Sequence, residues 1–275
     1  MNRGKLKIIL FTTVVLTLGI SIYISKNMLS LNTYEIESEK IENQVKIVQL
    51  TDLHNSTFGE NNKKLIEKIK LENPDIITMT GDIINSDTEN FDVLLNLVEK
   101  LHKIAPIYFS LGNHEYENRY LNEIIKEVEH AGAIVLEENY KDIVVNGNNI
   151  RIGGVYHYII PNMYKTPSMY KFLQEFADTD NFTLLLAHVP DSYVLWGGHT
   201  VLYPDIILSG HYHGGLIRIP FIGGIFAPEQ GLFPKYDAGK YEIEEVKIII
   251  SKGLGTSSKI PRINNIPEIS VIILK

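Results

Sequence analysis

From residue 45 onward the chain repeats one pattern, which limits its fold more than any other feature. A short β-branched apolar run comes first, a polar cluster of Asp, Asn, His or Gly follows it, and a segment with helical spacing completes the unit. This alternation predicts an α/β fold. Strands are expected over 45–50, 75–80, 107–111, 182–187, 205–209, 246–250 and 269–274. Apolar residues spaced about 3.6 apart predict helices over 91–104 and 121–128.

An uncharged apolar run precedes this pattern. Residues 8–24, "IILFTTVVLTLGISIYI", lie between Lys7 and Lys26. At about 1.5 Å per residue the run is about 25 Å long, close to the ~30 Å hydrocarbon core of a bilayer, and it is apolar on all sides. No small-residue cleavage pattern follows it in "YISKNMLSLN". We therefore expect an uncleaved transmembrane anchor in contact with the lipid bilayer.

The charges around the anchor predict its orientation and the domain layout. Arg3, Lys5 and Lys7 precede the run and Lys26 follows it, so the N-terminus is expected in the cytoplasm and the rest outside the cell membrane. Residues 1–30 then form the cytoplasmic tail and anchor, and residues 31–44 form a polar linker. Residues 45–275 show no repeat or composition break, which predicts one domain.

Charge and cysteine content restrict the possible partners. Residues 1–30 hold four basic and no acidic residues, so the remaining 245 hold 22 basic and 33 acidic residues, a net charge of −11. Such a surface repels polyanions, and nucleic acid is not expected as a partner. The chain has no cysteine, which excludes disulfides and thiolate ligands. Any metal must therefore bind to nitrogen and oxygen atoms. The oligomeric state stays open.

Metal-binding residue types follow each of the five main predicted strands. In an open α/β sheet the carboxyl ends of the strands share one edge, so these side chains are expected to converge. Each cluster alone has an ordinary structural explanation, such as a turn at Gly81–Asp82 or a histidine that caps backbone. Five such clusters, each at the end of a predicted strand, favour a shared metal-binding site. Its members are Asp52, His54, Asp82, Asn113, His114, His188, His211 and His213.

The donor set predicts two cations. Three side chains with oxygen donors and four imidazoles, leaving His114 aside, are too many for one tetrahedral ion. Two ions a few ångströms apart hold a phosphoryl group between them and activate the attacking water. The mixed N/O donors suit Mn, Fe or Zn better than Ca or Mg, and we favour Mn. On an extended "GHYHGG" loop, His211 and His213 would each face a different ion.

The ordered motifs D-x-H, GD, GNHE, H and GH-x-H resemble the calcineurin-like metallophosphoesterases over about residues 45–275. The resemblance implies a four-layer α/β/β/α sandwich. It also implies a first metal on Asp52, His54 and His213, a second on Asn113, His188 and His211, and Asp82 bridging both. His114 would then give a proton to the leaving oxygen or stabilise charge on phosphorus.

Within that family, "GGLIRIPFIGGIF", "GLFPKYDAGKY" and "SKGLGTSS" look like a membrane-anchored branch that acts on lipid-linked or UDP-linked substrates. "GGVYHY", residues 153–158, departs from it, since many relatives in this branch carry acidic residues there. The departure concerns the substrate pocket and leaves the metal set intact.

The expected activity is hydrolysis of a phosphodiester or pyrophosphate bond, in a lipid or lipid-linked substrate at the membrane. A soluble nucleotide or phosphomonoester is the alternative substrate, and a scaffold that binds metal without catalysis is the alternative of another class. Arg218 and Arg262 are candidate phosphate clamps or solvated arginines. The apolar segment 218–228 either folds onto the core, touches lipid or contacts a second copy. His157 and His199 are further candidates to line the cleft.

Overall fold

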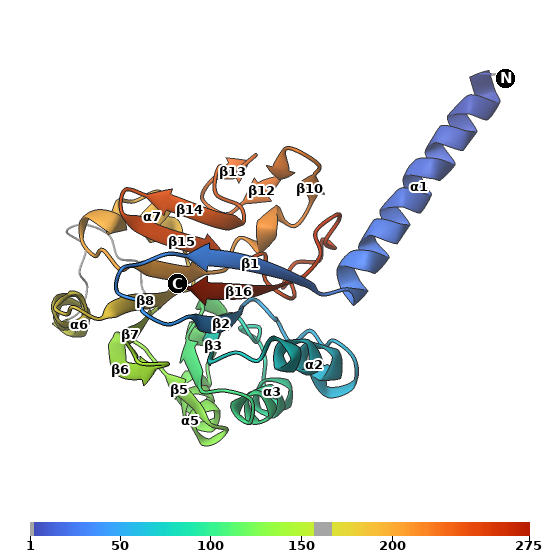
Figure 1. The fold of residues 1–275 in the computed structure, drawn as a ribbon. Helices are drawn as coiled ribbons and strands as arrows, with labels where there is room; N and C mark the ends of the chain where they lie inside the picture. Colours follow the sequence, from blue (N-terminus) through green and yellow to red (C-terminus); the bar gives the residue numbers. More distant parts are fainter. Residues whose placement is uncertain (1–2, 157–166) are drawn as a thin grey trace.

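Two six-stranded mixed sheets form the body of the computed structural model, which describes residues 3–156 and 167–275 (Figure 1). The first sheet has the order β1 (Ser30–Ile36), β16 (Glu268–Leu274), β2 (Val45–Leu50), β3 (Ile76–Thr80), β4 (Ile107–Ser110) and β5 (Ala133–Val135). The second has the order β14 (Gly239–Ile243), β15 (Val246–Ile250), β9 (Ile206–Ser209), β8 (Phe182–Ala187), β7 (Asn148–Val155) and β6 (Asn139–Val145). The inner strands β2–β3–β4 and β7–β8–β9 run parallel within their sheets.

The side-chain pattern of the inner strands explains how the sheets pack. In β2, Val45 and Ile47 join the core between the sheets, whereas Val48 and Leu50 face the helices on the other side. Apolar residues on both faces are expected of parallel strands that are covered on both sides. The first sheet packs against α2 (Lys63–Glu72), α3 (Asp92–His102) and α5 (Leu121–His130). The second packs against α6 (Pro167–Ala177). The α/β expectation is confirmed.

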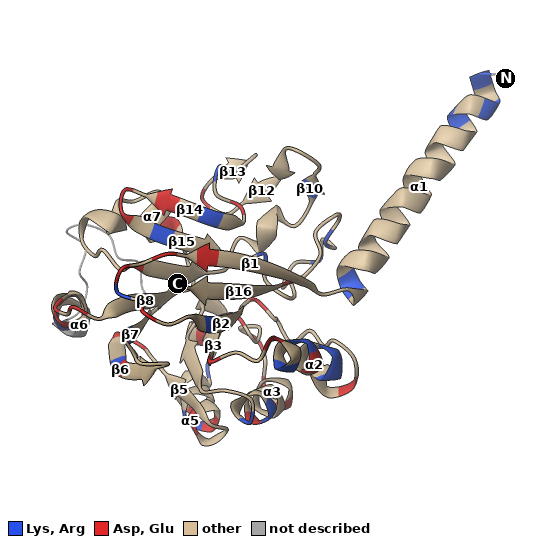
Figure 2. Cartoon of the chain, in the orientation of Figure 1, with Lys and Arg blue, Asp and Glu red and all other residues tan. Residues whose placement is uncertain are grey.

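The N-terminal helix α1, Arg3–Asn27, extends away from the sheets (Figure 1). Its side chains are exposed along nearly all of its length, and it is long and apolar enough to cross a membrane. Figure 2 shows basic residues only at its two ends. Length and composition of this kind fit a membrane anchor or a secretion signal.

The expected polar linker over 31–44 is wrong in its first half, because residues 30–36 form strand β1. This strand pairs in parallel with β16, with Ser30 opposite Glu268 and Ile36 opposite Leu274. The buried Glu268 carboxylate accepts hydrogen bonds from Asn32 Nδ2 at 2.7 Å and Tyr34 Oη at 2.8 Å. Polar side chains that look like a linker in sequence therefore hold an edge strand in place.

Two short hairpins follow the "GHYHGG" loop, residues 210–215. They consist of β10 (Arg218–Ile219) with β11 (Gly223–Gly224), and β12 (Phe226–Ala227) with β13 (Gly231–Leu232). Ala227 is buried, but several large apolar side chains are not. Phe221 is fully exposed and Ile222 is 63% exposed. More than half of the surface of Phe226, Leu232 and Phe233 is also exposed. The segment 218–228 is therefore only partly folded onto the core.

Candidate metal centre

The predicted site residues lie in the loops directly after five strands. Asp52 and His54 follow β2, Asp82 follows β3, and Asn113 and His114 begin the short helix α4 (Asn113–Tyr116) after β4. His188 follows β8, while His211 and His213 follow β9. The first three loops belong to one sheet and the last two to the other, so the cluster spans both sheets.

The side chains converge into three overlapping groups whose ligand atoms lie within 4.8 Å of one another. The groups are Asp52–His54–His213, His54–Asp82–His114 and Asp82–His188–His211. Asp82 and His54 each belong to two of them. Histidine and carboxylate donors at this spacing fit a dinuclear metal site.

Asp82 lies at the centre of the cluster. Its Oδ2 is 3.1 Å from His188 Nε2, 3.8 Å from His54 Nε2 and 3.9 Å from His114 Nε2. Its Oδ1 accepts the backbone N–H of His114 at 2.8 Å. At the other end of the cluster, Asp52 Oδ1 is 3.6 Å from His213 Nε2. The carboxylate of Asp82 thus faces histidines from the loops of both sheets.

Five cluster residues adopt left-handed backbone conformations that such residues rarely take. The φ angles are positive at Asp52, His54, Asp82, His211 and His213. Each costs on the order of 1–3 kcal/mol and persists only where surrounding contacts impose it. Hydrogen bonds between the loops after β2 and β3 are such contacts. The backbone N–H of Asp52 donates to Gly81 O at 3.0 Å, and that of His54 donates to Asp82 O at 3.1 Å.

The "GHYHGG" loop is not extended as expected, because φ is 71° at His211 and 50° at His213. The two imidazoles still lie in different groups, His211 with Asp82 and His213 with Asp52. The glycine before them allows the close approach: any Cβ on Gly210 would overlap Thr51 and the Asp52 carboxylate. In turn, the backbone N–H of His211 donates to Asp52 at 3.1 Å.

Hydrogen bonds set the tautomers of two buried histidines. His188 Nδ1 donates to the carbonyl of Thr80 at 2.8 Å, and His54 Nδ1 donates to Asn85 Oδ1 at 2.9 Å. In the neutral ring Nε2 then carries the lone pair. Within the described part of the chain, His54 Nε2, His188 Nε2 and Asn113 Oδ1 are buried without a hydrogen-bond partner. Such orphaned acceptors, facing two carboxylates, fit bound divalent cations.

Burial and mutual charge shift the pKa values of the cluster in opposite directions. Burial lowers the pKa of His54 to about 4 and that of His211 to about 3. Burial also acts against the charge on His188, but the nearby Asp82 carboxylate outweighs it and raises the pKa of His188 to about 10. For Asp82, burial is outweighed by His188, and its pKa falls well below the usual range. Without metal, the site thus pairs an ionised Asp82 with a protonated His188, while His54 and His211 stay neutral.

Glu115, the last residue of GNHE, is buried beside the site although it is not in the predicted ligand set. Its carboxylate accepts backbone N–H groups from Gly112 at 2.9 Å, Asp82 at 2.7 Å and Ile83 at 2.7 Å. It therefore ties the loop after β3 to the loop after β4. Burial raises its pKa to about 7. The sequence signal was the Glu of GNHE, three residues after the glycine that precedes α4.

The candidate phosphate clamps differ in their surroundings. Arg218 pairs with Asp237 at 2.9 Å and donates to Gly214 O, so its guanidinium is engaged within the chain. Arg262 is 5% exposed and its Nη2 lies 3.5 Å from His213 Nδ1, beside the cluster. His199 donates to the carbonyl of Tyr193 at 3.1 Å and lies in none of the three histidine–carboxylate groups. His157 and Tyr158 of "GGVYHY" lie outside the described residues.

Fold and cluster together define a metal-dependent phosphoesterase, a hydrolase. The chain belongs to the calcineurin-like phosphoesterase family, whose model matches residues 45–215. It is 32% identical to the uncharacterized metallophosphoesterase YkuE of Bacillus subtilis, over 94% of this chain and 89% of that protein. It is 28% identical to the phosphodiesterase YaeI of Escherichia coli, over 83% of this chain and 82% of that protein.

Among solved structures, a 5'-nucleotidase precursor from Thermus thermophilus matches with a TM-score of 0.48 and 18% identity. The match covers 76% of this chain and 49% of that one.

Proposed function

We propose that the enzyme is anchored in the cell membrane by α1 and hydrolyses a phosphodiester or pyrophosphate bond in a lipid or lipid-linked substrate. One observation carries the proposal: Asn265 contacts both α1 and the metal centre. Its backbone N–H donates to Ser25 Oγ of α1 at 3.2 Å, and its side-chain amide donates to the carbonyl of His213 at 2.7 Å. The helix therefore ends against the site and not on a remote face.

The connection between α1 and the sheet supports an uncleaved anchor. Only Met28 and Leu29 separate the helix from β1, and Leu29 is 9% exposed. Ser25 is buried, and Ser21 Oγ accepts the backbone N–H of Asn264 at 2.6 Å. A cleaved signal ends in a small-residue cleavage site, and "YISKNMLSLN" after the apolar run offers none. The charges at the helix ends favour an extracytoplasmic catalytic domain.

The hairpin β10–β11 supports a lipid-facing surface beside α1. Asn264, which is bonded to α1, also donates to the carbonyl of Arg218 in β10 at 3.1 Å. The tip of this hairpin carries the exposed Phe221 and Ile222. Exposed apolar clusters on soluble surfaces mark contacts with proteins or membranes, and an adjoining membrane helix favours the membrane.

For the metal centre, we assign Asp52, His54 and His213 to one cation, and His188, His211 and Asn113 to the other. Asp82 would bridge them. The groups Asp52–His54–His213 and Asp82–His188–His211 support this assignment. For Asn113, the support is its buried Oδ1, which has no hydrogen-bond partner in the described part of the chain. When bound, the two cations polarise the phosphoryl oxygens and lower the pKa of the attacking water. Mn is favoured among Mn, Fe and Zn.

The hydrogen bonding of His114 supports its role as proton donor. Its Nδ1 accepts the backbone N–H of Ser86 at 3.0 Å, so Nε2 carries the proton in the neutral ring. This is the opposite tautomer to His54 and His188. A ring with N–H at Nε2 donates to a leaving oxygen and does not ligate through that atom.

Mass spectrometry of a membrane lipid extract tests the substrate. The full chain in detergent, loaded with Mn²⁺, is incubated with the extract and a chromogenic phosphodiester. Loss of one phosphate-bearing lipid together with dye cleavage supports the proposal. Dye cleavage without lipid loss indicates a soluble nucleotide or phosphomonoester as substrate, and no cleavage of either returns the scaffold alternative. Protease digestion of intact cells tests the orientation, and full protection of residues 31–275 contradicts it.

A further inference from the structure

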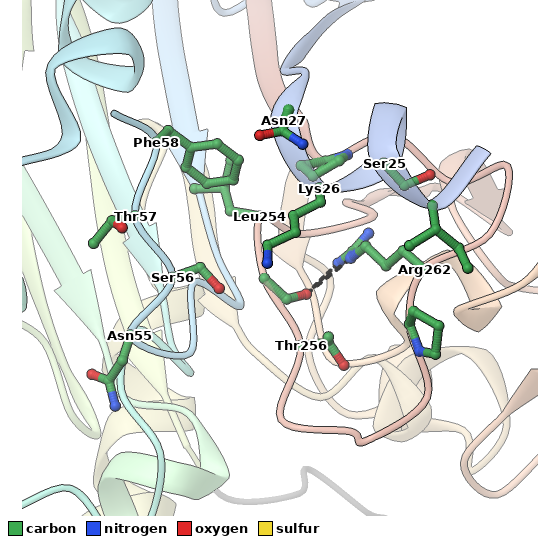
Figure 3. A pocket seen from close by; sticks show the side chains of 14 residues that line it. Ser25, Lys26, Asn27, Asn55, Ser56, Thr57, Phe58, Leu254, Thr256 and Arg262 are labelled. Atoms are coloured by element: carbon green, nitrogen blue, oxygen red, sulfur yellow. Dashed lines mark hydrogen bonds between the residues drawn. The ribbon is translucent and has the colours of Figure 1, made fainter. Parts of the chain in front are cut away.

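A cavity of about 430 Å³ lies between the last turn of α1 and the metal centre. Its walls come from α1, from the loop that follows His54 and from the segment 254–267. Figure 3 shows the side chains of Lys26 and Arg262 among those that line this space. The wall is polar at Lys26, Ser56 and Arg262, and apolar at Ile22, Phe58 and Leu254.

The charge of the cavity differs from that of the domain around it. Lys26 and Arg262 line it, and none of the described lining residues is acidic. Residues 31–275 carry a net charge of −11. A cationic pocket within an acidic surface attracts an anionic ligand locally. The lining hydroxyl and amide groups add neutral hydrogen-bond donors.

Arg262 lines this cavity, is held in place by backbone carbonyls and keeps one unused donor group. Its Nε donates to the carbonyl of Gly255 at 3.0 Å, and its Nη2 donates to the carbonyl of Lys252 at 2.6 Å. Its Nη1 is buried and has no hydrogen-bond partner in the described part of the chain. Half of the guanidinium is thus fixed in place, while the other half still needs an acceptor. Phosphate oxygens suit such a fixed, charged donor.

The position of the cavity relates it to the reaction. Arg262 lines the cavity, and its Nη2 is 3.5 Å from His213 Nδ1, so the cavity adjoins the candidate metal centre at this arginine. Lys26 is the last basic residue of α1, where a lysine extends its ammonium group to the plane of lipid phosphates.

We propose that this cavity binds the phosphate-bearing head group of an amphiphile arriving from the bilayer. Arg262 and Lys26 hold its anionic oxygens, and Ile22, Phe58 and Leu254 contact the first apolar part of the molecule. The inference rests on the proposed function and narrows its substrate class to phosphate esters joined directly to a lipid chain. Arg262 and Lys26 are positioning residues in this scheme.

Two esters with the same leaving group test the proposal. Methyl para-nitrophenyl phosphate and dodecyl para-nitrophenyl phosphate are given to the full chain in neutral detergent with Mn²⁺. The native enzyme should show a lower KM for the dodecyl ester. Lys26→Gln should raise that KM roughly five- to tenfold, the loss of one charge-assisted contact, while kcat changes little. Lys26→Arg should restore it. Lys259→Gln, which removes an exposed lysine outside the cavity, is the matched control.

Binding without catalysis gives a second readout. Dodecyl phosphate is titrated calorimetrically into the metal-free full chain, with inorganic phosphate as the head-group-only probe. We expect binding of dodecyl phosphate that weakens in Lys26→Gln and Arg262→Gln. Equal affinity for inorganic phosphate assigns the cavity to free phosphate and overturns the lipid inference.

The two proposals fail in different ways. If neither ester is hydrolysed, the proposed hydrolysis of a phosphodiester fails. If both esters are hydrolysed with the same KM, and Lys26→Gln does not change it, the phosphodiesterase activity is confirmed and the cavity inference is overturned. If Arg262→Gln loses metal by elemental analysis, that arginine belongs to the metal site and its part in the inference is withdrawn.

Discussion

Glu115 accepts the backbone N–H of Asp82 at 2.7 Å, so one fully buried carboxylate fixes the loop that presents another. Asp82 has a φ of 55°, in the left-handed region. The backbone needs an outside contact to stay there, and Glu115 supplies it from the neighbouring loop. Asp82, in the middle of the cluster, is therefore positioned by Glu115, which is not in the predicted ligand set.

Glu115→Gln should weaken metal binding. Glutamine has one acceptor oxygen and an NH₂ group that faces N–H donors, so at least one of the bonds from Gly112, Asp82 and Ile83 is lost. Loss of a residue that orients a ligand typically costs about 10–100-fold in metal affinity or activity. Metal content after dialysis and kcat both report the effect. The exposed Glu117→Gln, on the same turn, is the control. Full metal content in Glu115→Gln contradicts the positioning role.

Asp82→Asn should abolish most turnover. The neutral amide cannot balance two cations, and it offers one acceptor oxygen where the carboxylate offers two. We expect kcat to fall at least about a hundredfold with loss of one or both metals. Steady-state kinetics and elemental analysis measure both quantities. The exposed Asp87→Asn lies five residues along the same loop region and should behave as the native enzyme does. Native turnover in Asp82→Asn excludes it as the bridge.

His114→Ala separates proton donation from metal binding. The Nε2–H tautomer makes His114 a donor, so its removal should keep both metals and lower kcat about 10²–10⁴-fold. A substrate with a good leaving group, such as para-nitrophenol, should be affected less than an alkyl ester. The exposed His130→Ala in α5 is the control. Loss of metal in His114→Ala would place this residue among the ligands.

The convergence of the metal cluster could be predicted from sequence because it depends on a local rule. Parallel strands bring their carboxyl ends to one edge, and the residue types after each strand name the donors. The predicted ranges 45–50, 182–187 and 246–250 coincide with β2, β8 and β15. Buried parallel strands are apolar on both faces, so their boundaries are sharp in the sequence.

Other strands were missed for different physical reasons. The hairpin β6–β7 has the Asn146–Gly147 turn, with positive φ at both residues, but β6 is half-exposed and partly polar and does not show the apolar run of a buried strand. Strand β1 could not be predicted from its own residues. Its partner β16 lies at the other end of the chain, and its anchor, Glu268, is known only from the folded structure.

The strained loop conformations were also out of reach of sequence reasoning. Asp and His at φ near 50° contradict local preference, which would place glycine there. The loops adopt them because contacts between loops, such as His54 N with Asp82 O, impose the geometry. The same reason explains why the extended "GHYHGG" loop was a wrong expectation, although His211 and His213 do lie in different histidine–carboxylate groups.

Asp191, at the start of α7 (Asp191–Val194), should make stability depend on pH. It is fully buried, and burial raises its pKa to about 6 from the ordinary 3.8. The folded state then keeps a proton that the unfolded state has lost between these values, so the contribution of Asp191 to stability falls as pH rises from about 4 to about 6. Above that range both states are ionised and the penalty is constant.

Asp191→Asn removes this penalty without changing the size of the side chain. The unfolding free energy of the variant relative to the native chain should therefore rise by up to about 3 kcal/mol between pH 4 and pH 7. Urea denaturation of the detergent-solubilised chain across this range measures it, with the exposed Asp180→Asn as control. A relative stability that stays flat, or that falls toward pH 7, shows that the folded protein holds Asp191 as an ordinary ionised carboxylate.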